Sequence, residues 1–163
     1  VVDRFSEFVN PEEPIPYHIE QLTSITDEMV MHAPVIEEIL PKFLDFCGDA
    51  IVVAHNAAFD TGFIRKNAID MGLSFENTIM DTMTLCHVLL PELGKFTLDR
   101  VCKALNVKNE HHHRAVDDAN ATAKVFVKLY DMLTERGIKT VDDVNELGIS
   151  SDDTIKKLSL IHI

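Results

Sequence analysis

The stretch AIVVAHNAAFD, residues 50–60, decides the fold because it passes from a strand pattern to a helix pattern within a few positions. Its first part is a continuous apolar run rich in β-branched residues, which predicts a strand buried on both faces, as in a parallel sheet. A helical pattern follows and ends at Gly72. Open α/β sheets bind ligands at the carboxyl ends of their strands, so we expect a site around His55, Asn56 and Asp60. Structural roles remain open for these three: a buried imidazole with satisfied hydrogen bonds, a turn residue and a helix N-cap.

Strand and helix patterns alternate along the chain, which predicts one α/β domain built in layers. Expected strands cover residues 1–9, 50–56 and 78–80, and the prolines of NPEEPIP at 10–16 predict an extended loop. Expected helices are one capped by Thr26 or Asp27, with Pro34 in its first turn and Gly48 at its end, then 57–71, 82–90, one capped by Thr97, and 115–135 before Gly137. The domain should span residues 1–137, followed by an acidic helical extension or linker at 138–163.

Composition limits the classes of function. The 163 residues carry 15 Lys and Arg against 27 Asp and Glu, a net charge of −12 that repels nucleic acid and anionic membranes. If the substrate is a polyanion, divalent metal must supply much of the counter-charge. Three dispersed cysteines favour a reducing compartment over a disulfide framework, and neither a signal peptide nor a membrane-spanning run is evident. We therefore expect a cytoplasmic protein with no membrane partner.

A second stretch, HHHRAVDDANA at residues 111–121, places two aspartates at the start of a long helical pattern. Steps of three and four from Asp118 reach Thr122, Val125, Leu129 and Met132, with Ala115, Ala119, Phe126 and Leu133 alongside, so Asp118 should point inward. Steps from Asp117 reach a solvent stripe of Ala121, Lys124, Lys128, Asp131 and Glu135. An inward carboxylate needs a cation or donors. His113 can share a site with Asp118 only from the loop before the helix; otherwise the histidines are a solvated loop or a weak surface metal site, zinc included.

Two inward acids from separate elements, together with a histidine, suit two-metal hydrolysis of a phosphodiester. The carboxylates hold the metal ions, and the imidazole accepts a proton from the attacking water near neutral pH. Oxygen ligands favour Mg²⁺ or Mn²⁺ over zinc.

At these residues the sequence resembles a known family. HNAAFD, followed 53 residues after Asp60 by HRAVDDA, is similar to the second and third motifs of the DEDDh 3′–5′ exonucleases of the ribonuclease H-like superfamily. IEQLTSIT, DTMTL and KFTLDRVCKALNV also resemble that family in order and spacing. The resemblance is strongest to the exonuclease domain of PolC-type replicative DNA polymerase III. It implies a three-layer α/β/α fold with a mixed central sheet that lacks its first strands here.

The resemblance also implies roles for single residues. Asp118 would bind metal directly, Asp60 directly or through water, and His113 would be the general base. Leu22, Thr23 and Ile25 would lie near the 3′-terminal nucleotide, and Asn56 and Phe59 near the scissile end. Ser24 stands where the family usually has Gly, and Asp81 with Thr82 resembles the family's DT pair, although helix capping explains Asp81 equally well. The implied partners are a single-stranded DNA 3′ end and the rest of a DNA polymerase III chain and replisome, and the implied cofactors are two Mg²⁺ or Mn²⁺ ions.

The family's first motif, Asp-x-Glu on the first strand, is absent from this sequence. The chain opens on a strand pattern without Met, so we expect it to be cut inside a domain, with those acids a short distance upstream of Val1. The final KLSLIHI is a candidate unnatural tail. Two carboxylates hardly position two ions, and a missing central strand leaves a sheet edge open, so we expect little activity and marginal folding from this chain alone. A separate DEDDh exonuclease acting on RNA or oligonucleotides and a non-catalytic nuclease-fold binding module remain alternatives.

Overall fold

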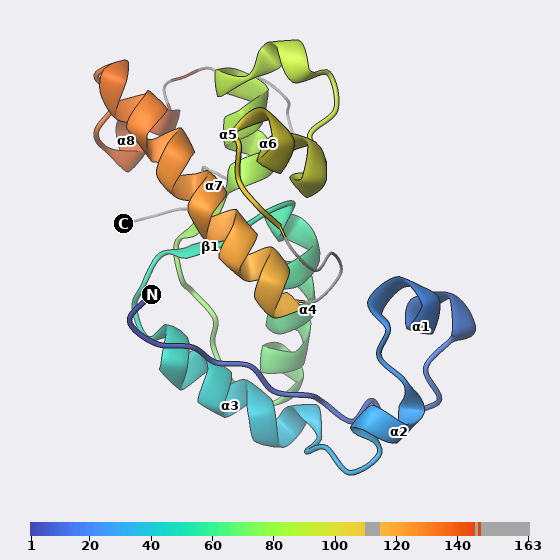
Figure 1. Ribbon diagram of the computed structural model, residues 1–163. Coiled ribbons are helices and arrows are strands. Elements are labelled where there is room, and N and C mark those ends of the chain that lie inside the picture. Colours follow the sequence, from blue (N-terminus) through green and yellow to red (C-terminus); the bar gives the residue numbers. More distant parts are fainter. Residues whose placement is uncertain (110–114, 146, 148–163) are drawn as a thin grey trace.

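A computed structural model describes residues 1–109, 115–145 and 147. Helices surround a small sheet, and the long helix α7 crosses the molecule (Figure 1). In chain order the elements are α1 (Tyr17–Thr23), α2 (Asp27–Val30), α3 (Ile36–Cys47), β1 (Val52–Ala54), α4 (Ala57–Asp70), β2 (Ile79–Asp81), α5 (Thr82–Leu89), the 3₁₀ turn η1 (Pro91–Leu93), α6 (Leu98–Ala104), α7 (Ala115–Glu135) and α8 (Val141–Asn145).

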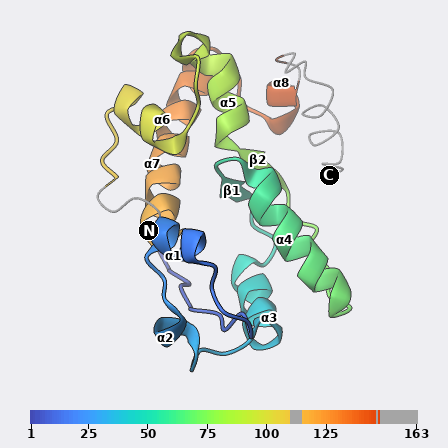
Figure 2. The same cartoon turned by 90° about the vertical axis from the view of Figure 1, so that its right-hand side faces the viewer.

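The two strands pair in parallel and separate two layers of helices. The register places Val52 opposite Ile79 and Val53 opposite Met80. Because successive strand residues point to opposite faces, Val52 and Ile79 pack with α3 and α4, whereas Val53 and Met80 pack with α5 and α7. Figure 2 shows α4 and α7 on opposite sides of the strands. The predicted three-layer arrangement is confirmed; the described strands are parallel, so an antiparallel strand of the expected mixed sheet is not among the described residues.

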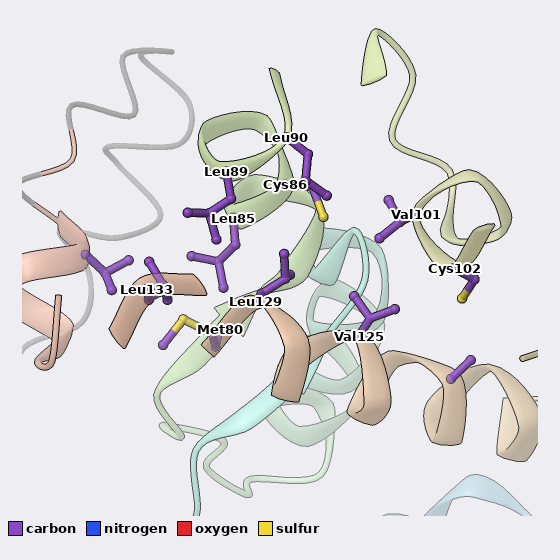
Figure 3. Close-up of a cluster of buried hydrophobic side chains, with 12 residues drawn as sticks. Met80, Leu85, Cys86, Leu89, Leu90, Val101, Cys102, Val125, Leu129 and Leu133 are labelled. Atoms are coloured by element: carbon purple, nitrogen blue, oxygen red, sulfur yellow. The ribbon is translucent and has the colours of Figure 1, made fainter. Parts of the chain in front are cut away.

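The larger core lies between α5, α6 and α7. Leu85, Cys86, Val101, Val125 and Leu129 are essentially inaccessible to solvent and face one another in Figure 3. Burying each such aliphatic side chain stabilises the fold by about 1.5–3 kcal/mol. This core fixes the distance between α7 and the strands, and so the place of the first turns of α7.

The opening segment is not the predicted strand. Within the described residues the only strand ladder joins β1 to β2, and residues 1–9 form an extended chain instead. Phe5 packs against Phe43 and Phe46 of α3, with ring centroids 5.8 and 5.6 Å apart, and the segment runs beside α3 in Figure 1. Phe5 therefore covers a helix, a use that alternation alone does not distinguish from strand pairing.

A helix boundary and the burial of a strand also differ from prediction. The helix expected after Thr26 is split into α2 and α3, and Pro34 precedes α3, whose N-cap Val35 has an extended backbone. A residue before proline avoids the helical region, which explains the break near Ala33. Strand β1 is only half-buried, with Ile51 half-exposed beside it, so burial on both faces was wrongly predicted.

Other elements match the sequence pattern. Helix α7 has the predicted bounds, α4 and α5 differ by one residue at their ends, and α6 follows Thr97. The extended loop at 10–16 is also observed. Helix α8 lies in the proposed extension, whose existence as a separate unit stays a prediction.

Candidate active site

A pocket of about 560 Å³ lies at the carboxyl end of β1, where the sequence predicted a site. Four parts of the chain meet there: the end of α1, the junction of β1 with α4, the start of α6 and the start of α7. The pocket is lined by Leu22, Thr23, Val53, Ala54, His55, Asn56, Phe59, Asp60, Thr97, Leu98, Asp99, Ala115, Asp118, Ala119 and Thr122.

Two predicted metal ligands, Asp60 and Asp118, line this pocket from separate helices. Each is the fourth residue of its helix, where free backbone N–H groups favour a negative charge. Asp118 Oδ1 accepts a hydrogen bond from Asn109 Nδ2 at 3.1 Å. Burial raises the pKa of the Asp60 carboxyl, and the charge of Asp81 raises it further against the lowering effect of a backbone N–H. Asp60 is not the N-cap of α4, because that position belongs to Asn56.

The facing of α7 agrees with prediction at Asp118 but not throughout. Thr122, Val125 and Leu129 are buried on the Asp118 face. Ala121, assigned to the solvent stripe, is only 2% exposed, because its small side chain joins the core of α5 and α6. Ala115 and Ala119, assigned to the apolar face, are exposed and line the pocket instead. Asp117 is half-buried and does not line the pocket.

Asp81 ties the turn after β1 to the start of α5. Its Oδ1 accepts hydrogen bonds from the backbone N–H groups of Met83, at 2.9 Å, and Asn56, at 3.0 Å. Asn56 has a left-handed backbone (φ 64°), which a short polar side chain tolerates. Of the two roles considered for Asp81, the geometry therefore favours capping.

His55 joins three elements at the pocket wall. Its Nδ1 lies 2.9 Å from Thr82 Oγ1, and its Nε2 lies 2.7 Å from the carbonyl oxygen of Phe96. A carbonyl only accepts, so Nε2 carries the hydrogen. The Phe96 ring also contacts His87 in a tilted arrangement, with centroids 3.9 Å apart. These contacts, here called the Phe96 clamp, hold the loop whose next residues form the pocket wall.

That wall, made by Thr97, Leu98 and Asp99, was not identified as part of the site from the sequence. The similarity of KFTLDRVCKALNV to the exonuclease family was the one signal available. The wall depends on the hydrogen bond from His55, which joins residues 41 positions apart and leaves no local pattern.

The predicted nucleotide-binding residues are mostly brought together. Leu22, Thr23, Asn56 and Phe59 line the pocket. Ile25 does not; it lines a neighbouring groove of about 330 Å³ that shares Thr23 with the pocket. Ser24, between them, has a left-handed backbone (φ 56°), a conformation that suits the Gly expected there.

His113, the predicted general base, lies outside the described residues, as does the rest of 110–114. Among the residues the structure describes, no three His, Cys, Asp or Glu side chains are grouped to hold a metal ion. Asp60 and Asp118 do offer carboxylate oxygens, the ligand type that Mg²⁺ and Mn²⁺ prefer, and thus fit part of such a site. None of the described helices has the length and apolar character needed to cross a bilayer.

Comparison with known proteins agrees with this geometry. The exonuclease family model, RNase T, matches residues 1–126. PolC-type DNA polymerase III of Caldanaerobacter subterraneus subsp. tengcongensis is 46% identical over 163 residues, and that of Clostridium perfringens 50% over 164, each aligning with 100% of this chain. The chain spans only 12% and 11% of these relatives. A solved structure, exonuclease X in complex with 5′ overhanging duplex DNA, superposes with a TM-score of 0.67 and 27% identity, covering 90% of this chain and 81% of its own. The protein therefore belongs to the RNase T family of exonucleases and has their ribonuclease H-like fold.

Proposed function

We propose that this chain forms part of a 3′–5′ exonuclease domain that hydrolyses phosphodiester bonds at DNA 3′ ends and proofreads within a replicative DNA polymerase III. The observation that carries the proposal is the meeting of Asp60 and Asp118 in one pocket with Leu22 and Phe59. The printed names of the relatives supply the polymerase context, and the name of the solved structure supplies DNA as the substrate class.

Asp60 and Asp118 would hold divalent metal. When bound, Mg²⁺ or Mn²⁺ would activate water and stabilise the leaving oxygen. Asp60 is exposed at the pocket, but partial desolvation and the charge of Asp81 raise the pKa of its carboxyl, and a bound cation would favour the ionised form. Asn109 orients the Asp118 carboxylate by its hydrogen bond. His113 accepts the proton of the attacking water in this proposal.

Exposed apolar side chains at the pocket suit a nucleotide base. Phe59 is 80% and Leu22 51% exposed, and they line the pocket from α4 and α1. Stacking of a base on an aromatic ring tolerates every sequence, as a proofreading site must. Asn56 would lie at the scissile end.

Activity of this chain alone is expected to be low. Asp60 and Asp118 are two of the four acids that the family's chemistry uses, and two carboxylates neutralise two divalent ions poorly. The comparison is between this chain and a longer polypeptide extended on its amino side, both incubated with Mg²⁺ or Mn²⁺ and 5′-labelled single-stranded DNA. We expect a ladder of labelled, 3′-shortened products from the longer polypeptide and little from this chain. Equal activity of the two would contradict the two-carboxylate argument.

Substitutions in the longer polypeptide test the roles. Asp118→Ala should abolish turnover, and His113→Ala should lower kcat by about 100- to 10,000-fold. Asp117→Ala is the matched control and should be nearly neutral, because its side chain does not line the pocket. Damage from Asp117→Ala with a neutral Asp118→Ala would refute the assignment. RNA of the same sequence, included as a second substrate, tests the alternative of an RNA exonuclease.

A further inference from the structure

Residues 95–108 are the most basic stretch of their length in the sequence. They carry four cations, Lys95, Arg100, Lys103 and Lys108, and a single acid, Asp99, in a chain of net charge −12. All four cations are exposed. The ion pair found in the described part of the chain, Lys66 with Asp70, does not involve any of the four.

Helix α6 arranges these cations toward solvent. Val101 and Cys102 are buried against α7, which turns the opposite side of the helix outward. Arg100 and Lys103 are three residues apart and therefore neighbours on that outer face. Lys95 precedes α6 and Lys108 follows it, so the cations extend along the whole segment.

The same segment borders the pocket. Thr97, Leu98 and Asp99 form its wall, immediately between Lys95 and Arg100. The Phe96 clamp fixes this end through the 2.7 Å bond to His55 and the ring contact with His87. Lys95 and Arg100 thus flank a wall of the pocket that contains Asp60 and Asp118, and Lys103 and Lys108 continue the same segment away from that wall.

The part of the chain that contains α1 has the reverse charge. Leu22 and Thr23 line the pocket from α1, and between Arg4 and Lys42 the sequence contains eight acids and neither Lys nor Arg. The groove beside that wall includes Glu7 and Glu13. A polyanionic strand that leaves the pocket is repelled on the α1 side and attracted on the α6 side.

We propose that Lys95, Arg100, Lys103 and Lys108 form a basic rim that binds the sugar–phosphate backbone of the DNA strand whose 3′-terminal nucleotide occupies the pocket. The inference rests on the proposed function for its ligand. It adds the direction of the strand, over α6 and away from α1, and it explains how an acidic protein retains a polyanion.

The test compares two triple variants of equal charge. The rim variant carries Arg100→Glu, Lys103→Glu and Lys108→Glu; the control carries Lys42→Glu, Lys128→Glu and Lys139→Glu, at exposed positions outside the rim. Binding of fluorescein-labelled oligothymidylate is measured by anisotropy across a series of salt concentrations, after circular dichroism confirms folding. Each phosphate contact contributes about 0.7 to the slope of log K against log salt for single strands, so the rim variant should lose about 2 from the slope magnitude. The control should keep the parent slope.

These variants are made in the longer polypeptide. Equal slopes and affinities in the two variants would overturn the rim, as would a parent longer polypeptide that fails to bind the oligonucleotide at low salt. Hydrolysis of the p-nitrophenyl ester of thymidine 5′-monophosphate by the longer polypeptide separates this result from the proposed function, because that ester reaches only the pocket. Unchanged ester hydrolysis in the rim variant, with the reduced salt slope, supports the rim. Absence of ester hydrolysis in the parent longer polypeptide counts against the nuclease proposal, while the slope comparison still decides the rim.

Discussion

Replacing His55 should loosen one wall of the pocket without unfolding the protein. His55→Leu removes the hydrogen bond to the Phe96 carbonyl, 2.7 Å long, and the one to Thr82. Thr82 Oγ1 keeps the Ala54 carbonyl as a partner at 3.2 Å, so most of the loss falls on the loop before α6. A partly buried carbonyl left without its donor costs about 1–3 kcal/mol. Opening of this loop should therefore become about 5- to 150-fold more frequent.

Hydrogen exchange followed by mass spectrometry measures that opening directly. A peptide covering residues 95–105 reports it, because the Val101 N–H to Thr97 carbonyl bond at the start of α6 depends on the clamped loop. A peptide from 125–135 in the core of α7 is the internal control. His55→Gln should restore part of the protection, since its side-chain amide retains a donor for the Phe96 carbonyl. Unchanged exchange in His55→Leu, or equal acceleration in both peptides, would refute the idea that His55 holds this wall in particular.

Three other predictions concern the core, a buried thiol and metal. Leu129→Ala should lower the free energy of unfolding, measured in urea, by about 2–5 kcal/mol, because Leu129 is fully buried. Lys128 is exposed, so Lys128→Ala should change that free energy by less than about 0.5 kcal/mol. Similar effects of the two substitutions would contradict the facing of α7. Burial raises the pKa of Cys86 to about 12, so the thiol ionises at lower pH in the unfolded chain than in the folded one. The contribution of the neutral thiol to stability is complete below pH 8.5 and falls by about 1.4 kcal/mol per pH unit toward pH 12. The stability difference between the parent and Cys86→Ala should shrink over that pH range, and a constant difference would disprove the prediction. Mn²⁺ at about 100 times its Kd should raise the free energy of unfolding of the parent by about 2.7 kcal/mol, and that of Asp118→Asn by less. Thermal unfolding with and without Mn²⁺ measures both increases, and identical increases would exclude Asp118 as a ligand.

Local periodicity correctly predicted helices whose buried residues repeat at helical spacing. Helix α7 presents a buried stripe over 21 residues and was found with its predicted bounds. The opening segment shows the limit of such reasoning. Its alternating residues suit a strand, yet Phe5 packs on α3. The sequence of residues 1–9 alone does not distinguish pairing with a strand from packing on a helix.

The candidate site divides in the same way. Asp60 and Asp118 could be predicted because one follows a strand end and the other lies on the buried side of a helix. The wall formed by Thr97 to Asp99 could not, since it is placed by contacts of Phe96 with His55 and His87. Ile25 was expected beside Thr23 but faces the adjacent groove, because the left-handed turn at Ser24 directs the chain away from the pocket.

Asp81 links the architecture of the site to its electrostatics. One oxygen of this carboxylate caps α5 and holds the Asn56 N–H, so the turn that carries α4, and with it Asp60, is fixed by a negative charge. After burial itself, that charge is a further cause of the raised pKa of Asp60. The fold therefore positions one acid with another and makes ionisation of Asp60 more costly. A divalent cation bound by Asp60 and Asp118 would offset this cost, as the proposed function requires.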